Sequence, residues 1–161
     1  MEEAPIPKDE KERLDAVHRM AILDTQPEER FDRLTREAVN RLKVPISTVT
    51  IIDSNREWFK SCIGLSDKEG DRAVSFCGHV LLSEDILVVE DTLLDPRFKD
   101  NPMVALSPFI RFYAGVALHD HKTHQPIGVF CVKDTKPRSF SLAEMGILME
   151  LAGQAEEELN K

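Results

Sequence analysis

Ile46-Ser47-Thr48-Val49-Thr50-Ile51-Ile52 is followed by the turn residues Asp53-Ser54-Asn55 and then by Glu57-Trp58-Phe59-Lys60-Ser61-Cys62-Ile63. The first run is rich in β-branched residues and partly alternates, which is typical of a strand. The second run reads as its hairpin partner and ends at Gly64. Strands joined by so short a turn pair antiparallel. This stretch therefore predicts a β-hairpin around which the rest of the chain is arranged.

Further strands are predicted on the C-terminal side of this hairpin, at residues 86–89, 112–118 and 127–132. Residues 64–74 read as a polar loop, and residues 76–82 are apolar enough for a short helix that Ser75 would cap. Residues 91–111 read as a long loop, because Asp95-Pro96 and Asn101-Pro102 are turn or helix-start signals.

Three longer helices are predicted at the two ends of the chain. The first covers residues 9–22 and the second residues 27–42, with Pro27 at its first position. Ser141 and Glu144 form a capping box that opens a helix running to the chain end. Its apolar positions are Leu142, Met145, Met149, Ala152 and Leu159. Terminal helices that can cover one face of an antiparallel sheet give an α+β layout.

The length, charge and composition of the chain exclude several classes of function. The 161 residues fit one domain, predicted at residues 9–161 behind a flexible acidic N-terminus of residues 1–8. That length leaves no room for a kinase or cyclase domain beside a sensor. A net charge of −8 argues against nucleic acid as a partner. The sequence has no apolar run of membrane-helix length and no secretory signal, and its three cysteines follow no disulfide-like pattern. We therefore expect a cytoplasmic location.

The chain resembles the GAF domain family, the small-molecule sensor modules of bacterial signalling proteins. The resemblance covers nearly the whole chain and rests on the number and order of short motifs. The matching motifs are Ala21-Ile22-Leu23-Asp24-Thr25, Pro27-Glu28-Glu29-Arg30-Phe31-Asp32, Trp58-Phe59-Lys60-Ser61, Ser75-Phe76-Cys77-Gly78-His79, Val89-Glu90-Asp91-Thr92, Asp95-Pro96-Arg97-Phe98, Asn101-Pro102, Ile110-Arg111-Phe112-Tyr113-Ala114-Gly115 and Gly128-Val129-Phe130-Cys131-Val132-Lys133-Asp134.

This resemblance implies a five- or six-stranded antiparallel sheet with terminal helices on one face. A ligand pocket is implied on the other face, under the short helix and long loop. Relatives bind cyclic nucleotides, bilins, haem or small metabolites, or no known ligand. No cyclic-nucleotide signature is present, and Gly78 separates Cys77 from His79, which breaks the Cys-His pair of bilin-binding relatives. We therefore expect a non-catalytic sensory domain whose small-molecule ligand and cofactor stay unidentified, either a stand-alone regulator or the sensor part of a histidine kinase or diguanylate cyclase.

The candidate ligand-binding residues are polar side chains, which could lie at the edge of the pocket, and aromatic side chains, which could line it. Arg111 could clamp an anionic ligand, or could pair with Asp91 or Glu90 to fix the loop. Arg97 and Asp95 could likewise brace a helical turn. The candidate set is Trp58, Ser75, Phe76, Cys77, His79, Asp91, Arg111, Phe112 and Tyr113.

Two alternatives come from other classes. Cys77-Gly78 resembles the context of the reactive cysteine in free methionine-R-sulfoxide reductases, with Cys62 in a plausible hairpin, although the expected extra cysteine nearby is missing. The chain could also be a ligand-free dimerisation and interaction module, and the terminal helices predict a homodimer in either case. His119, His121 and His124 read as a solvated turn, so no metal site and no catalytic residue is assigned.

Overall fold

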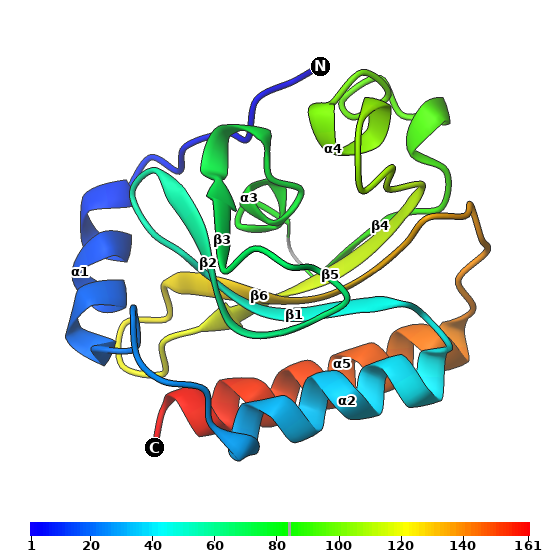
Figure 1. Cartoon of the computed structure of the whole chain (residues 1–161). Coiled ribbons are helices and arrows are strands. Elements are labelled where there is room, and N and C mark those ends of the chain that lie inside the picture. The colour runs from blue at the N-terminus through cyan, green and yellow to red at the C-terminus, as the bar shows by residue number, and fades with distance from the viewer. Residues whose placement is uncertain (84) are drawn as a thin grey trace.

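The computed structural model describes residues 1–83 and 85–161, and its centre is a six-stranded antiparallel sheet in the order β3-β2-β1-β6-β5-β4 (Figure 1). The hairpin predicted from the sequence is confirmed, with Ile51 paired to Trp58. It lies beside the hairpin formed by the last two strands. The strands are β1 Ile46–Ile52, β2 Arg56–Ile63, β3 Glu69–Asp71, β4 Ile86–Val89, β5 Phe112–His119 and β6 Pro126–Asp134.

Helices α2 (Glu29–Leu42) and α5 (Leu142–Leu159) lie side by side across one face of the sheet (Figure 1). Helix α1 (Glu10–Met20) stands at the end of the sheet beside the β5–β6 turn, where Arg13 Nη1 donates to the Pro126 carbonyl at 3.4 Å. The opposite face carries only short elements. These are α3 (Cys77–Val80), α4 (Pro102–Ala105) and the 3-10 turns η1 (Arg72–Val74) and η2 (Thr92–Leu94).

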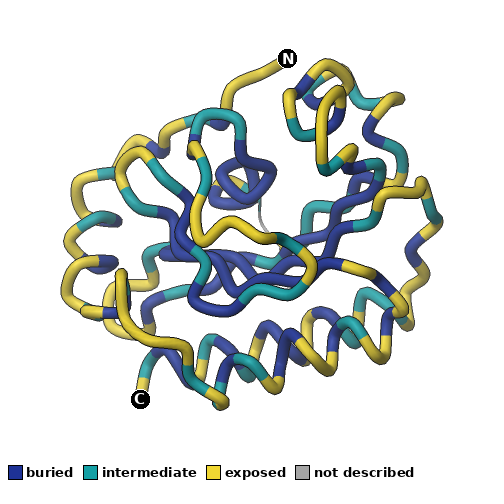
Figure 2. The backbone as a smooth tube through the Cα atoms, viewed as in Figure 1, coloured by how far each residue is buried: buried dark blue, intermediate teal, exposed yellow. Residues whose placement is uncertain are grey.

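The sheet separates two apolar cores (Figure 2). The larger core packs Phe31 and Leu34 of α2 and Leu148 and Leu151 of α5 against β1, β5 and β6. The smaller core lies under α3, which is buried along its whole length. Alternation along β6 produces this division, because Phe130 and its neighbours at even spacing face the helices.

Three local expectations differ from the structure. Helix α2 begins at Glu29, so Pro27 lies outside its first turn. The polar loop expected at 64–74 contains β3 and η1, since a three-residue strand is too short to show alternation. The buried side of α5 is Leu148, Leu151, Ala152, Ala155 and Leu159, whereas Leu142 and Met149 point to solvent.

Residues 1–8, expected as a flexible N-terminus, run across α3. The Ala4 amide donates to the Ala73 carbonyl at 2.9 Å, and the Glu2 amide donates to the Arg97 carbonyl at 3.1 Å. A Cβ atom on Gly78 would lie 2.6 Å from the Ala4 Cβ atom, so this close approach requires glycine. The N-terminal segment thus covers α3 from outside.

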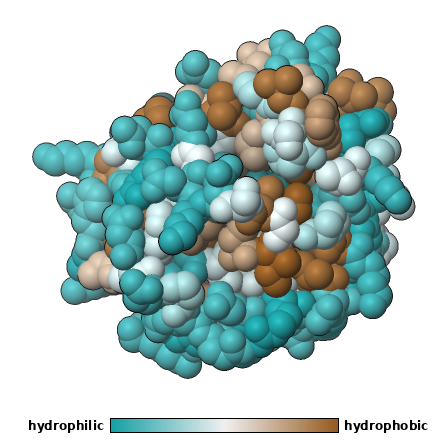
Figure 3. Space-filling view, in the orientation of Figure 1, coloured by the Kyte–Doolittle hydropathy of each residue, from teal (hydrophilic) through white to brown (hydrophobic). Residues whose placement is uncertain are grey.

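The surface seen in Figure 3 is mostly hydrophilic, with apolar side chains gathered near α4. Leu106 and Phe109 follow that helix and are more than half exposed. No helix among residues 1–83 and 85–161 combines the length and apolar character needed to cross a membrane.

Candidate functional site

The short helix α3 brings a group of buried side chains over the centre of the sheet. Phe76 stacks on Tyr113 of β5 at a ring-centroid distance of 5.1 Å and contacts Phe98 at 4.5 Å. The Ser75 hydroxyl accepts from the Gly78 amide at 3.0 Å and donates to the Arg72 carbonyl at 2.7 Å, which fixes the start of the helix. Of the predicted ligand-binding residues, the structure brings together Ser75, Phe76, Cys77, His79 and Tyr113.

Two thiols lie at the base of this group. The Tyr113 hydroxyl donates to Cys77 Sγ at 3.1 Å, and Cys131 Sγ on β6 lies 3.0 Å from the Thr48 hydroxyl. Thr48 and Thr50 hydrogen-bond each other at 2.7 Å, and the Cys77 thiol reaches Thr50 at 3.9 Å. A continuous polar chain therefore joins the two cysteines beneath α3.

Two charged side chains complete the arrangement, and neither was among the residues expected from the sequence. Glu57 of β2 and Lys133 of β6 are 1 % and 0 % exposed, and Glu57 Oε1 and Lys133 Nζ have no hydrogen-bond partner. We call the five residues Glu57, Cys77, Tyr113, Cys131 and Lys133 the α3 site. The sequence holds one indication that Lys133 lies near Cys131. The two residues are two positions apart on a strand, so their side chains lie on the same face of the sheet.

Burial and the interactions among the five residues shift the pKa values of the α3 site. Burial raises the pKa of Glu57, and it raises the pKa of Cys77 and Tyr113 well above their ordinary values. Burial also raises the pKa of Cys131, but a hydrogen bond with Cys77, the Lys133 charge and a hydrogen bond with Thr48 outweigh it and leave that pKa at about 7. The neighbouring thiols and carboxyl raise the pKa of Lys133 despite its burial. The site thus holds a persistent cation beside an acidic thiol.

His79 lies at the outer edge of this site. Its ring packs edge-on against Phe98 at 4.8 Å, and Nε2 lies 3.2 Å from the Glu2 carbonyl oxygen. Burial lowers the pKa of His79, which favours the neutral imidazole.

Asp91 and Arg111 pair with each other at 3.1 Å, near the start of β5. Asp91 also accepts from the Leu93 amide at 3.1 Å, which caps η2. Arg97 and Asp95 form a similar local pair at 2.7 Å. These contacts match the bracing role that the sequence left open for each pair.

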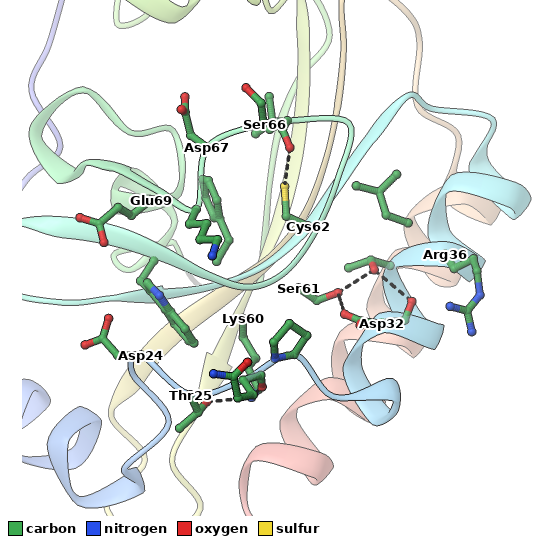
Figure 4. A pocket seen from close by; sticks show the side chains of 18 residues that line it. Asp24, Thr25, Asp32, Arg36, Lys60, Ser61, Cys62, Ser66, Asp67 and Glu69 are labelled. Carbon is green, nitrogen blue, oxygen red and sulfur yellow. Dashed lines mark hydrogen bonds between the residues drawn. The ribbon is translucent and has the colours of Figure 1, made fainter.

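Trp58 and Phe112 belong to the core on the α2 and α5 face, away from α3. Phe112 packs against Phe140 at a centroid distance of 5.3 Å. Trp58 lines a groove of about 670 Å³ beside β2, shown in Figure 4. The tertiary structure therefore divides the predicted residues between two faces of the sheet.

The groove beside β2 is polar, and the charged groups at its base, Lys60 and Asp32, already have partners. Lys60 Nζ pairs with Glu28 at 2.8 Å and donates to the Thr25 hydroxyl at 2.7 Å. The Ser61 hydroxyl donates to Asp32 at 2.6 Å (Figure 4). Because these groups are satisfied within the protein, the groove offers less for a ligand than the α3 site.

His119 and His121, at the β5–β6 turn, contact Glu156 near the end of α5. The His119 amide donates to Glu156 Oε1 at 2.7 Å, and His121 Nε2 lies 3.0 Å from Glu156 Oε2. Within residues 1–83 and 85–161, no group of three His, Cys, Asp or Glu side chains is placed to hold a metal ion.

The antiparallel sheet has long helices on one side and a short helix over a buried site on the other, which defines a small α+β domain. A model of the GAF domain family matches residues 26–159, so the chain belongs to the GAF domain family.

A curated bacterial protein is similar to this chain over part of its length. It is 37% identical over 145 residues to a cyclic di-GMP phosphodiesterase of Pseudomonas aeruginosa, a match that covers 90% of this chain and 24% of that protein. The chain thus spans about a quarter of the length of that curated relative.

Solved structures confirm the fold at low sequence identity. The GAF domain of an Acinetobacter phosphoenolpyruvate-protein phosphotransferase superposes with a TM-score of 0.65 at 20% identity, covering 92% of each chain. A free methionine-R-sulfoxide reductase from Neisseria meningitidis, solved with its substrate, gives 0.63 at 16% identity over 99% of this chain and 95% of that one.

Proposed function

We propose that this chain is a non-catalytic sensory domain that binds a small molecule at the α3 site and regulates a protein that turns over cyclic di-GMP. The observation that carries the signalling context is the 37% identity to part of a cyclic di-GMP phosphodiesterase. Because the match spans only a quarter of that relative, the phosphodiesterase chemistry would reside in another domain. The three free cysteines support a reducing, cytoplasmic setting.

The α3 site supports ligand binding through Glu57 and Lys133, which are both buried and whose Oε1 and Nζ atoms have no hydrogen-bond partner. A buried polar group that lacks a hydrogen bond costs about 1–3 kcal/mol, and more when it is charged. A ligand with an acceptor for Lys133 Nζ and a donor for Glu57 Oε1 would relieve that cost. Such a ligand would enter by displacing α3, since α3 and the side chains under it are buried.

A route from the site to the end of α5 follows β5. Tyr113 lies in the site, and β5 continues to His119, which binds Glu156 near the end of α5. Helix α5 also packs along β5. A ligand that binds one packing of α3 and β5 more tightly would shift the population of α5 positions.

The test is thermal unfolding of the chain with single additions of free L-amino acids, mononucleotides and cyclic di-GMP. A compound present at 100 times its dissociation constant stabilises the folded state by about 2.7 kcal/mol. We expect one class to raise the melting temperature, and expect Lys133→Met to abolish the rise while the exposed control Lys136→Met keeps it. If no compound shifts the wild type, or if the shift survives Lys133→Met intact, the proposed site is wrong.

The reductase alternative has one structural observation in its favour, the hydrogen-bonded chain through Thr48 and Thr50 that joins Cys77 and Cys131. Cys77 itself is buried with a raised pKa, which makes it a weak nucleophile, and the acidic thiol is Cys131. Turnover of free methionine sulfoxide by the wild type, lost in Cys77→Ser, would favour a reductase over a sensor.

We also propose a homodimer through the terminal helices. The outward side of α5 exposes Leu142 and Met149, 85 % and 45 % exposed. Residues 1–15 and 150–161 each carry a net charge of −3, so salt should tighten the dimer by screening like charges. Sedimentation at low and high salt tests this, with Leu142→Glu expected to weaken the dimer. A dimer with no bound compound would instead support a ligand-free interaction module.

A further inference from the structure

Cys77 and Cys131 come from different elements, α3 and β6, yet their sulfur atoms share one hydrogen-bonded network. Cys131 Sγ lies 3.0 Å from the Thr48 hydroxyl, Thr48 and Thr50 hydrogen-bond each other at 2.7 Å, and the Cys77 thiol reaches Thr50 at 3.9 Å. Lys133 lies two residues beyond Cys131 on the same face of β6, and its ammonium is fully buried and has no hydrogen-bond partner. An ammonium beside a thiol favours the thiolate, the form of cysteine that reacts with peroxides.

We propose that Cys77 and Cys131 form an oxidisable dithiol, which hydrogen peroxide converts to a disulfide that ties α3 to β6. This modification goes beyond the proposed ligand binding and does not require it.

The chemistry balances in two steps. The Cys131 thiolate attacks one peroxide oxygen and the O–O bond breaks. Cys131 becomes a sulfenic acid, and the released hydroxide takes up the proton that the thiol lost, giving water. The Cys77 sulfur then attacks the Cys131 sulfur, the S–S bond forms and the S–O bond breaks. The leaving hydroxide takes the Cys77 proton as a second water, so two thiols and one peroxide give one disulfide and two waters.

Position distinguishes this pair from the third cysteine. Cys62 lies on β2 opposite Thr48, and β1 separates it from Cys131 on β6. Its thiol is directed to the Leu65 carbonyl at 3.7 Å. Burial raises the pKa of Cys62, so it is protonated at neutral pH.

Peroxide reaches the buried pair by local opening of α3. This helix has four residues, and its cover is the N-terminal segment, held by a few backbone hydrogen bonds. Segments with few contacts open at a lower free energy than the core strands beneath them. The disulfide would remove the Cys77 sulfur as acceptor of the Tyr113 hydroxyl and hold α3 against the sheet.

The experiment treats the folded chain with hydrogen peroxide, blocks remaining thiols with N-ethylmaleimide, and maps the products by mass spectrometry. We expect wild type and Cys62→Ser to lose two thiols and to yield one peptide pair linked through Cys77 and Cys131. Dithiothreitol should restore both thiols. Cys77→Ser should stop at a Cys131 sulfenic acid, trapped by dimedone, and Cys131→Ser should form no intramolecular disulfide.

A second measurement separates the proposal from simple exposure of thiols. Lys133→Met should slow peroxide consumption at pH 7 about fivefold, because a rise of one unit from a Cys131 pKa of about 7 lowers the thiolate fraction from half to about a tenth at fixed reactivity of the thiolate. The exposed control Lys136→Met should leave the rate unchanged. A linked product that contains Cys62, retention of all three thiols in the folded wild type, or equal rates in Lys133→Met and wild type would each overturn the proposal.

Discussion

Replacement of Phe76 by alanine tests whether aromatic packing holds α3 over the sheet. The Phe76 ring is 0 % exposed and lies between Phe98 and Tyr113, at centroid distances of 4.5 and 5.1 Å. Phe→Ala changes at such sites cost about 3–5 kcal/mol, because apolar area is lost and a cavity remains. That is a large part of the roughly 5–15 kcal/mol that stabilises a domain of this kind.

Urea unfolding followed by the fluorescence of Trp58 measures this change. With an m-value of about 2 kcal/mol per molar urea, the midpoint should fall by about 1.5–2.5 M. Leu94→Ala is the matched control, because Leu94 is 82 % exposed and should change stability by less than about 0.5 kcal/mol. The thiol of Cys77, next to Phe76, should also become faster to alkylate. A loss below about 1 kcal/mol would refute the view that this stack anchors α3.

Lys133→Met should raise the pKa of Cys131 from about 7 by about one unit, so that ultraviolet titration shows thiolate falling from half to about a tenth at pH 7; an unchanged titration would show that hydrogen bonds alone lower it. Gly78→Ala should destabilise the chain by about 1–3 kcal/mol, because the new Cβ would fall 2.6 Å from the N-terminal segment. Gly146→Ala in α5, whose Cβ would meet nothing within 4 Å, should instead stabilise it by up to about 1 kcal/mol in thermal unfolding. Burial raises the pKa of Glu10, but hydrogen bonds from two arginines leave it below its ordinary 4.5, so its stabilising effect is present above pH 4.5 and is lost as the pH falls through the folded-state value. Glu10→Gln should therefore lower the urea midpoint at pH 7, with the difference from wild type shrinking in acid; a difference that does not depend on pH would contradict this account.

Much of the fold could be predicted because burial and secondary structure leave a periodic signal in the chain. The β1–β2 hairpin followed from β-branched residues around a short turn, and the start of α5 from the Ser141–Glu144 capping box. The apolar spacing predicts Leu142 and Met149 on the buried side of α5, but both are exposed, because spacing alone does not tell which side of a helix meets the sheet.

The candidate site was predicted only in part. Ser75, Phe76, Cys77 and Tyr113 were selected through motif resemblance, and they do converge under α3. Glu57 and Lys133 were missed because charged residues are rarely buried without a partner, so a strand-end lysine is ordinarily read as solvent-facing.

The sequence by itself determined the family, the α+β class and the pairing of the first hairpin, since these depend on local pattern and on motifs read along the chain. The tertiary structure decided which side chains meet. It placed Trp58 and Phe112 on the helix-covered face, and it brought Cys77, Cys131 and Lys133 together on the other. The physical reason is that strand order and the position of α3 set the distances between residues far apart in the chain. Those distances determine the pKa of Cys131 and the burial of Glu57 and Lys133.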